Sequence, residues 1–274
     1  NSVLYSGAEF TLVRQSGLLR QYSRQHGWRH YLGDMNYKAV SDGLGGYKLA
    51  VTNTVGMEDY LIGVVAYEMS NTFPLEALKA QAVAARSYAA SKISPSASYD
   101  IVDTASDQVY KGYDSTLTNV IAAVNATKGQ VLANSSGALV QAYYSASNGG
   151  QTESTANAWG SPLPYYQMKD DPYDLRNTMS PTAKLTLPKI VSEASPLDAS
   201  LAGFLKNQLS PRLSALGYSG FTDTFSILGC SAAVAYSPKY PEPSRSYTRV
   251  KLYLTVGVSA SGTSVAPPQF LTLE

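Results

Sequence analysis

The N-terminal part of the chain alternates between apolar and polar positions in short runs. From Val3 to about Thr54 these runs are separated by glycine-containing turns, which is typical of small strands joined by tight loops. In the run Tyr47–Val51 the larger apolar side chains occupy every second position. We therefore expect a strand here with one buried face.

A helical pattern follows this region. The segments Glu58–Met69 and Pro74–Lys92 contain no internal Gly or Pro apart from Gly63, and Pro74 suits the first position of a helix. A third helix is predicted over Ser115–Lys128, where the apolar residues form one stripe at helical spacing.

Strand signals return after the third helix. Residues 130–132 and 139–144 flank Asn134–Gly137, a pattern that predicts a hairpin, and Asn148–Gly150 is expected to be a tight turn. Further on, a helix is predicted near Leu197–Leu209, interrupted by Pro211.

The last clear pattern is an alternation of apolar and polar residues from Thr248 to Val256, which predicts a half-buried strand. The fold class is therefore α+β, with mostly antiparallel strands and an inserted helical segment. We expect a single domain over residues 1–274, with a core at about 46–174, N-terminal strands at 1–45 and an α/β extension at 175–274.

Composition and charge narrow the range of functions. The chain has 274 residues, 44% hydrophobic and 15% charged, with a formal net charge of +1, so its overall charge gives no argument for a nucleic-acid partner. The single cysteine, Cys230, excludes an intrachain disulfide and a thiolate metal cluster. The sequence starts at Asn1, and we expect that an export signal or anchor has been removed.

Glu68 stands out among the acidic residues because of its place on the predicted first helix. Leu61, Val64 and Val65 form the apolar stripe of that helix, and Glu68 continues it. A carboxyl group on a core-facing stripe is desolvated, which favours its protonated form and makes it a candidate general acid. The alternative is a helix-terminal Glu that bends out to water.

Two cations on the next predicted helix are candidates for substrate contacts. Lys79 and Arg86 are nearly two turns apart, so we expect both to project from one face that could bind sugar hydroxyls or carboxylates. The alternative is a solvated face on which Glu76 pairs with Lys79.

At this point the sequence resembles a known family. The run DYLIGVVAYEMSNTFPLEALKAQAVAARSYA, residues 59–89, is similar to the signature of the stage II sporulation protein D family, also described as the amidase-enhancer domain family. Four more matching blocks follow in order: SDQVYKG (106–112), AVNATKGQVL (123–132), AYYSASNGGQTES (142–154) and AWGSPLPYY (158–166). The resemblance is strong from about residue 46 to 174 and weaker toward each end.

The resemblance implies cleavage of bacterial cell-wall glycan by a lytic transglycosylase, in sporulation, engulfment or wall remodelling. Glu68 matches the catalytic glutamate of the family, acting as acid toward the glycosidic oxygen between MurNAc and GlcNAc and then as base toward the MurNAc 6-hydroxyl. Lys79 and Arg86 match basic positions of the motif. The remaining residues implied in substrate binding are Gln108, Tyr110, Tyr143, Tyr144, Ser145, Ser147, Gly149, Gly150, Thr152 and Tyr165.

A lytic mechanism agrees with the carboxylates near Glu68. Ordinary glycoside hydrolysis needs a second carboxylate as nucleophile or base. The Glu68 block contains none at a paired position, and Glu76, Asp107, Glu153 and Asp170 are candidates only if the fold brings them close. The other functions considered are a glycan-binding module that activates an amidase without cleaving glycan, and a hydrolytic muramidase.

The resemblance also indicates surroundings and partners. We expect an extracytoplasmic protein at the bacterial cell wall, acting on glycan strands with or without stem peptides, with a cell-wall amidase as a candidate protein partner. Some relatives bind zinc through Cys and His in the matching blocks, but here those blocks contain neither residue. His26 and His30 have the i,i+4 spacing of a helical metal pair, but no third ligand is evident, so no metal or cofactor is expected.

Overall fold

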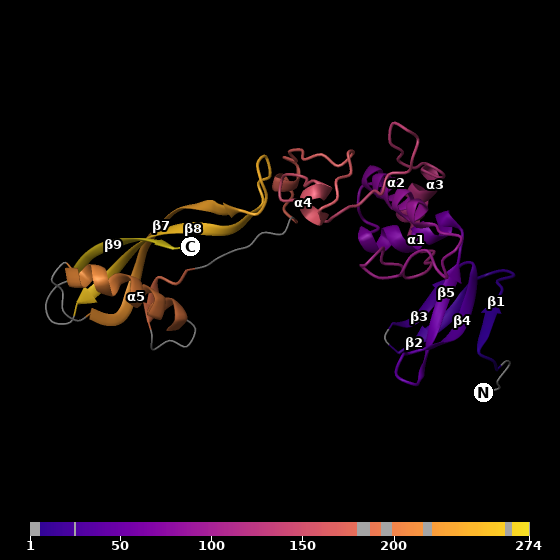
Figure 1. Cartoon of the computed structure of the whole chain (residues 1–274), viewed down its shortest axis with the longest axis horizontal. Helices are drawn as coiled ribbons and strands as arrows, with labels where there is room; N and C mark the ends of the chain where they lie inside the picture. The colour runs from indigo at the N-terminus through magenta and orange to yellow at the C-terminus, as the bar shows by residue number, and fades with distance from the viewer. Residues whose placement is uncertain are drawn as a thin grey trace. The chain divides into compact units, whose positions relative to one another are not determined.

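The computed structural model describes residues 6–24, 26–179, 187–192, 199–215, 221–260 and 265–273. The chain forms two compact units, residues 1–145 and 146–274, which are described separately (Figure 1). The boundary between them falls inside the stretch 46–174.

The first unit opens with short antiparallel strands, as predicted. Three of them form a sheet in the order β1-β4-β5, and the other two form a hairpin. Their bounds are β1 (Glu9–Leu12), β2 (Leu19–Ser23), β3 (Gly27–Tyr31), β4 (Asp34–Ser41) and β5 (Tyr47–Thr54).

The burial expected for β5 is wrong. Tyr47, Leu49 and Val51 do share one face of the strand, but all three are exposed. The cross-strand neighbours of Leu49 and Val51 are Ala39 and Tyr37, and no helix layer covers this face as a core. The alternation predicted the strand correctly but not its burial, because apolar residues are common on protein surfaces.

Three helices follow in the first unit: α1 (Met57–Glu68), α2 (Leu75–Lys92) and α3 (Thr118–Ala126). The predictions of all three are confirmed, with small shifts at their starts. Pro74 precedes α2 as its N-cap. The chain before α3 forms a turn instead of a helix, because the Asp114 carboxylate accepts hydrogen bonds from the Thr116 N–H and hydroxyl.

The helices enclose the core of the first unit. Leu61, Val64 and Val65 of α1 are fully buried, as the stripe predicted, and they pack with Leu78 of α2 and Val120 of α3. Complete burial of such side chains contributes roughly 1.5–3 kcal/mol each, so this cluster fixes the position of α1 and of the Glu68 end.

The predicted hairpin after α3 is present but short, because the Asn134 N–H donates to the Ala138 carbonyl at 2.8 Å and the Val140 N–H donates to the Leu132 carbonyl at 2.9 Å. Asn134 caps it by accepting bonds from the N–H groups of Ser136 and Ala138, and one bridge joins Ala133 to Leu139. Regular strands do not extend from this bridge within residues 130–144.

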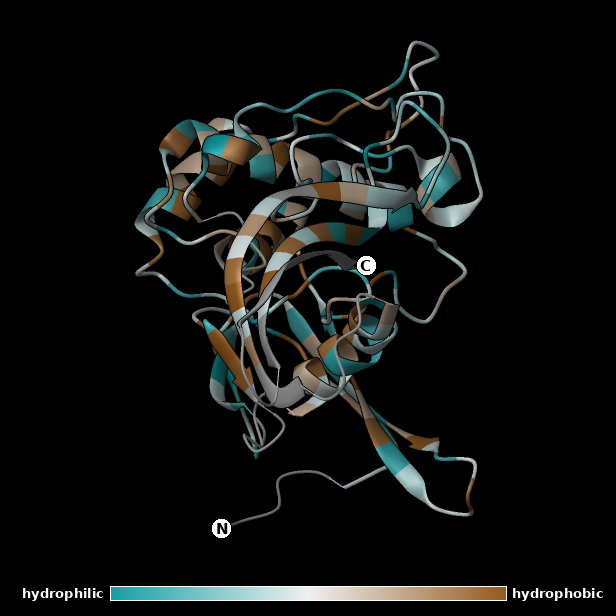
Figure 2. Cartoon of the chain, turned by 90° about the vertical axis from the view of Figure 1, so that its left-hand side faces the viewer, coloured by the Kyte–Doolittle hydropathy of each residue, from teal (hydrophilic) through white to brown (hydrophobic). Residues whose placement is uncertain are grey.

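The second unit contains a four-stranded antiparallel sheet in the order β6-β7-β8-β9. Its elements are α4 (Thr155–Trp159), the short 3-10 helix η1 (Asp174–Arg176), β6 (Ile190–Ser192), α5 (Ala199–Ala215), β7 (Phe221–Pro238), β8 (Tyr247–Ala260) and β9 (Val265–Leu273). Apolar and polar residues alternate along the long strands (Figure 2). In β8 only the later part of the predicted strand is buried, at Leu254 and Val256, while Val250 is exposed.

Helix α5 continues through Pro211, where an interruption was expected. Proline removes one hydrogen bond of the helix ladder. The buried stripe of Ala202, Leu205, Leu209 and Leu213 spans the proline, and its packing outweighs that loss. No helix in the described part of the chain is long and apolar enough to cross a membrane.

Candidate active site around Glu68

Glu68 is the last residue of α1 and is half-buried. Its Oε1 atom accepts a hydrogen bond of 3.2 Å from the backbone N–H of Val109. Its carboxylate also interacts with the Tyr144 hydroxyl. The side chain therefore neither enters the dry core nor bends out to open solvent, but lies between two polar groups of separate segments.

A chain of polar side chains continues inward from Glu68. Gln108 is 1% exposed and donates through Nε2 to the Tyr144 hydroxyl oxygen at 3.1 Å and to the Ala85 carbonyl at 3.2 Å. Its Oε1 accepts from the Tyr60 hydroxyl at 3.0 Å. Since the Tyr144 oxygen accepts from Gln108, the Tyr144 proton is available to Glu68. Burial raises the pKa of Tyr144, the Gln108 donor opposes this, and the Glu68 carboxylate adds to it.

A glycine brings the Val109 segment close enough to reach Glu68. At Gly63 of α1, a Cβ would overlap the Gly112 carbonyl oxygen and the Tyr110 ring. The Lys111 N–H donates to the Gly63 carbonyl at 3.2 Å. The segment can therefore lie directly on α1 only because position 63 has no side chain.

Next to this network, Asp107 is held by an ion pair and two further donors. Lys92 lies 3.0 Å from its Oδ1, the Tyr88 hydroxyl donates at 2.7 Å, and the Val102 N–H donates at 3.1 Å. Burial alone would raise the pKa of Asp107, but these hydrogen bonds outweigh it and lower the pKa below its usual value. Asp107 is thus a charge fixed by its partners.

Arg86 does not share an exposed face with Lys79, and this expectation is corrected. Arg86 is 2% exposed, and its guanidinium forms a two-pronged ion pair with Glu58 of α1 at 3.1 and 2.6 Å. It also donates to the carbonyl oxygens of Gln130 at 3.0 Å and Val124 at 3.3 Å. Arg86 therefore joins α1, α2 and the end of α3 inside the protein.

Lys79 forms the pair that the alternative interpretation expected. Its ammonium lies 2.7 Å from Oε1 of Glu76, one turn earlier on the same helix, and the Glu76 side chain is 82% exposed. This is a surface pair of ordinary strength.

The other candidates of the first unit differ in exposure. Tyr110 is buried and donates to Asn53 Oδ1 at 2.7 Å, so its hydroxyl is used within the fold. Tyr143 is exposed and donates to Gln141 Oε1 at 3.0 Å, and Ser145 is also exposed. Only Tyr143 and Ser145 of this group present side chains to solvent.

The block after Ser145 belongs to the second unit and is organised around Asp174. Oδ2 of Asp174 accepts from the Ser147 hydroxyl at 2.7 Å, from the Asn148 N–H at 3.0 Å and from the Gly149 N–H at 2.7 Å. These groups were expected to face substrate, and in the structure they hold an internal carboxylate.

Gly150, Thr152 and Tyr165 also lie in the second unit. Gly149 and Gly150 adopt φ of 70° and 94°, so the expected tight turn needs their lack of a side chain. The Thr152 hydroxyl donates to the Gln167 carbonyl at 2.9 Å, and the Tyr165 ring lies 5.3 Å from that of Tyr166.

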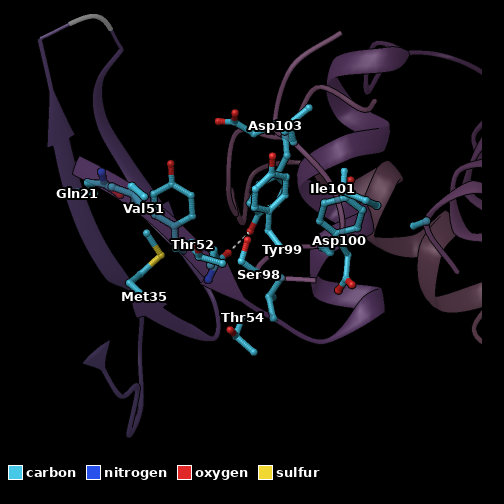
Figure 3. Close-up of a pocket in the computed structure, with 18 of the residues that line it drawn as sticks. Gln21, Met35, Val51, Thr52, Thr54, Ser98, Tyr99, Asp100, Ile101 and Asp103 are labelled. Carbon is cyan, nitrogen blue, oxygen red and sulfur yellow. Dashed lines mark hydrogen bonds between the residues drawn. The ribbon is translucent and has the colours of Figure 1, made fainter. Parts of the chain in front are cut away.

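A cavity of about 860 Å³ lies elsewhere in the first unit. Strand residues such as Val51 and Thr52 form one wall, and the loop from Ser98 to Asp103 forms the other (Figure 3). Tyr60 and Tyr110 also line it, but Glu68 does not. The cavity shares Tyr60 with the Glu68 network, since the Tyr60 hydroxyl donates to Gln108.

The two histidines are not on a helix. His26 lies in the turn between β2 and β3, and His30 lies within β3, so their spacing is not that of a helical metal pair. Cys230 is exposed on β7 in the second unit. Within the described ranges, no three His, Cys, Asp or Glu side chains are grouped to hold a metal ion.

Comparison with known proteins bears on the segment that carries Glu68. Residues 46–133 match the family described as Stage II sporulation protein, SpoIID. The amidase enhancer of Bacillus subtilis is 46% identical over 114 residues, covering 42% of this chain and 15% of that protein. Stage II sporulation protein D of the same organism is 34% identical over 149 residues, covering 48% and 42%. Residues 46–133 are therefore similar to the SpoIID and amidase-enhancer family.

A further relative in sequence is an uncharacterized protein of Brachyspira hyodysenteriae, 40% identical over 138 residues, covering 49% of this chain and 36% of that protein. The chain thus spans less than half the length of each of these relatives. The SpoIID match includes Glu68, Arg86 and Gln108, and ends before Tyr144.

Sequence reasoning missed several hydrogen-bond and ion-pair partners of the site candidates within residues 46–133. The Val109 donor is a backbone group and leaves no signal in the side-chain pattern. Glu58 was recognisable in the sequence, because an acidic residue in the first turn of a helix is favoured by the helix dipole. The burial of Arg86 was also recognisable, since Arg86 continues the helical stripe of Leu78, Ala82 and Ala89, all of which are buried.

Proposed function

We propose that the chain is a lytic transglycosylase of bacterial cell-wall glycan, with Glu68 as its general acid and base. The similarity to proteins named Stage II sporulation protein D and amidase enhancer supports a role at the cell wall. The observation that carries the chemistry is the hydrogen-bonded, half-buried Glu68 carboxylate with no paired cation among the described residues.

The proposed reaction uses one carboxyl group twice. Glu68 donates its proton to the oxygen between MurNAc and GlcNAc while the bond from MurNAc C1 to that oxygen breaks. The Glu68 carboxylate then takes the proton of the MurNAc 6-hydroxyl as that oxygen bonds to C1, which gives a 1,6-anhydroMurNAc end and restores the acid. The Val109 N–H and the Tyr144 hydroxyl orient the carboxylate for both steps.

The surroundings of Glu68 favour this reaction over hydrolysis. A hydrolase needs a second carboxylate that is free to act as nucleophile or base. In the first unit, Asp107 is engaged by Lys92 and Tyr88, and Glu76 is an exposed partner of Lys79. An internal hydroxyl nucleophile needs neither group.

We further propose that the protein acts outside the cytoplasm, on glycan strands whose stem peptides are present or removed, and in cooperation with a cell-wall amidase. Tyr143, Tyr144 and Ser145 are the substrate-binding candidates nearest in sequence to the Glu68 network. Tyr143 and Ser145 are exposed, which suits direct contact with a polysaccharide.

A second function, a glycan-binding activator of an amidase, is favoured by two observations. One relative carries the name amidase enhancer. In addition, Arg86, Gln108 and Tyr110 are buried and hydrogen-bonded within the fold instead of lining an open cleft. A protein that only binds glycan does not need these three side chains to reach the substrate.

Product analysis separates these functions. Purified chain is incubated with intact and with peptide-stripped peptidoglycan, and the soluble fragments are analysed by mass spectrometry. We expect 1,6-anhydroMurNAc ends from the wild type. Reducing MurNAc ends would assign a hydrolase, and an unchanged polymer with retained binding would assign the non-catalytic function.

A further inference from the structure

The β2–β3 hairpin is a strongly positive region in a chain of nearly balanced charge. Residues 11–33 contain four arginines and two histidines but no Asp or Glu, whereas the formal net charge of the whole chain is +1. Opposite charges must therefore be concentrated elsewhere, and this hairpin carries a local positive potential.

Strand alternation places rings and cations together on the outer face of the hairpin. Arg20 and Tyr22 are paired across the strands with His30 and Trp28, so the four side chains share one face. Tyr22 is 59% exposed and Trp28 is 60% exposed. The Arg20 guanidinium lies 4.8 Å from the Trp28 ring centre, and the Tyr22 ring lies 5.3 Å from it.

A polar cavity of about 450 Å³ is lined by two residues of this face, Trp28 and His30. Its lining residues are His26, Trp28, Arg29, His30, Tyr67, Lys111, Tyr113 and Asp114. The Lys111 ammonium lies 4.4 Å from the centre of the exposed Tyr67 ring, which repeats the pairing of Arg20 with Trp28. The single carboxylate of the lining, Asp114, already accepts two hydrogen bonds from Thr116.

These cations are available for an external anion. In the part of the chain that the structure describes, no ion pair joins Arg20, Arg24, Arg29 or Lys111 to a carboxylate. Four cations elsewhere in the first unit do have such partners, namely Lys38, Lys79, Arg86 and Lys92. Arg29 and Lys111 line the cavity, and Arg20 and Lys111 each lie over an exposed ring.

We propose that the hairpin surface, made of Arg20, Tyr22, Trp28, His30, Tyr67 and Lys111, binds an acidic saccharide. The ligand class is a polymer of sugar or polyol units that carry phosphate or carboxylate groups. Flat exposed rings suit the apolar faces of such units, and arginine forks and a lysine ammonium suit their anions. None of these residues takes part in the proton transfers at Glu68, so the inference goes beyond the proposed cleavage.

The test measures binding to defined polymers with the full chain. The chain has two tryptophans, so a Trp159→Phe background leaves Trp28 as the sole tryptophan, which is excited selectively over the tyrosines, and calorimetry gives an independent affinity. The probes are poly(glycerol phosphate), polygalacturonate and the neutral chitohexaose. We expect at least one acidic polymer to bind about tenfold or more tightly than the neutral sugar, to change Trp28 emission and to weaken as salt is added. The preferred polymer identifies the anion as phosphate or carboxylate.

A matched pair of double variants locates the site. Arg20→Gln with Lys111→Gln should weaken binding about tenfold or more. Lys48→Gln with Lys128→Gln removes the same charge from exposed positions outside the hairpin surface and should leave affinity unchanged. Equal losses in both pairs, equal binding of the neutral sugar, or equal binding of single-stranded DNA of matched charge would each overturn the proposal.

A Glu68→Gln variant keeps this test independent of the proposed function. Binding of the acidic polymer should persist in that variant whether or not the chain cleaves glycan. Loss of acidic-polymer binding there, with the fold intact, would mean that the ligand is held at Glu68 and not at the hairpin surface.

Discussion

Helix α1 carries a carboxylate near each end, and the structure holds the two in opposite ways. Near the N-terminal end, Glu58 is paired with the Arg86 guanidinium and also accepts from the Gly129 N–H at 3.1 Å. At the C-terminal end, Glu68 interacts with the Val109 N–H and the Tyr144 hydroxyl, which are neutral groups. Glu58 therefore has a cationic partner, whereas the hydrogen-bond partners of Glu68 are uncharged.

This difference separates a structural role from a chemical one. Protonating Glu58 would break an ion pair and leave a buried guanidinium without its counter-charge. Glu68 can gain or lose a proton without breaking any ion pair among the described residues. The helix dipole also favours negative charge at the N-terminal end and not at the C-terminal end.

The largest expected effect is at Glu68. Glu68→Gln keeps the shape of the side chain but cannot transfer a proton, so glycan cleavage should fall at least about 100-fold. The free energy of unfolding should stay within about 1 kcal/mol of its value without the substitution, measured in urea in the Trp159→Phe background, where Trp28 reports on the first unit. The exposed Glu76→Gln is the matched control and should retain activity. Comparable fragment release from Glu68→Gln would reject the assignment.

The opposite result is expected at Arg86. Arg86→Met leaves Glu58 without its cation and the Val124 and Gln130 carbonyls without their donor. The free energy of unfolding should therefore fall by about 3 kcal/mol. Adding Glu58→Leu should recover a large part of this loss. A fully stable Arg86→Met with lost activity would instead support the contact with substrate that the sequence motif implied.

Regular elements of the first unit were predictable because they depend on local pattern. The stripe of Leu61, Val64 and Val65 gave α1, and these residues are fully buried. Burial at β5 was not predictable in this way, because it depends on which layer covers a strand. Pro211 shows a related limit, since the packing of α5 outweighs the local cost of a proline.

The candidate site was predictable only in part for the same reason. Glu68 was found by its stripe position, and the resemblance supplied Gln108 and Tyr144, which the fold brings together. The partner of Arg86 lies 28 residues away in sequence, and the carboxylate that holds Ser147 lies 27 residues away. Such pairings follow from tertiary structure and not from spacing.

A smaller effect is expected at Tyr144. Tyr144→Phe removes the hydroxyl between Gln108 and Glu68 but keeps the ring, so turnover should fall about tenfold, equivalent to about 1.4 kcal/mol of transition-state free energy. Because Tyr144 would act by positioning Glu68, the pH dependence of turnover should also shift. Tyr47→Phe, at an exposed tyrosine of β5, is the control. An unchanged pH profile would assign Tyr144 to packing alone.

The contacts of Asp107 should make the free energy of unfolding depend on pH in the acidic range. Because the folded protein lowers the pKa of Asp107, its stabilising effect is present above the pKa of the unfolded chain and is lost as pH falls through the lower folded value. Wild type should therefore lose stability below about pH 4. Asp107→Asn should be less stable than wild type at pH 7, and its stability should fall less steeply as the pH is lowered. Parallel curves for the two proteins would show that the Lys92 and Tyr88 contacts contribute nothing.

The smallest effect on stability is expected at Lys79, the third charged site candidate of the motif beside Glu68 and Arg86. Lys79→Gln breaks only the surface pair with Glu76, which should cost about 0.5 kcal/mol or less. Its effect on cleavage then bears on the comparison of the two ends of α1, because Lys79 is neither buried like Arg86 nor part of the Glu68 network. Wild-type turnover would leave Glu68 as the one of these three candidates with a chemical role. A clear loss of turnover at unchanged stability would show that Lys79 leaves Glu76 to contact the substrate.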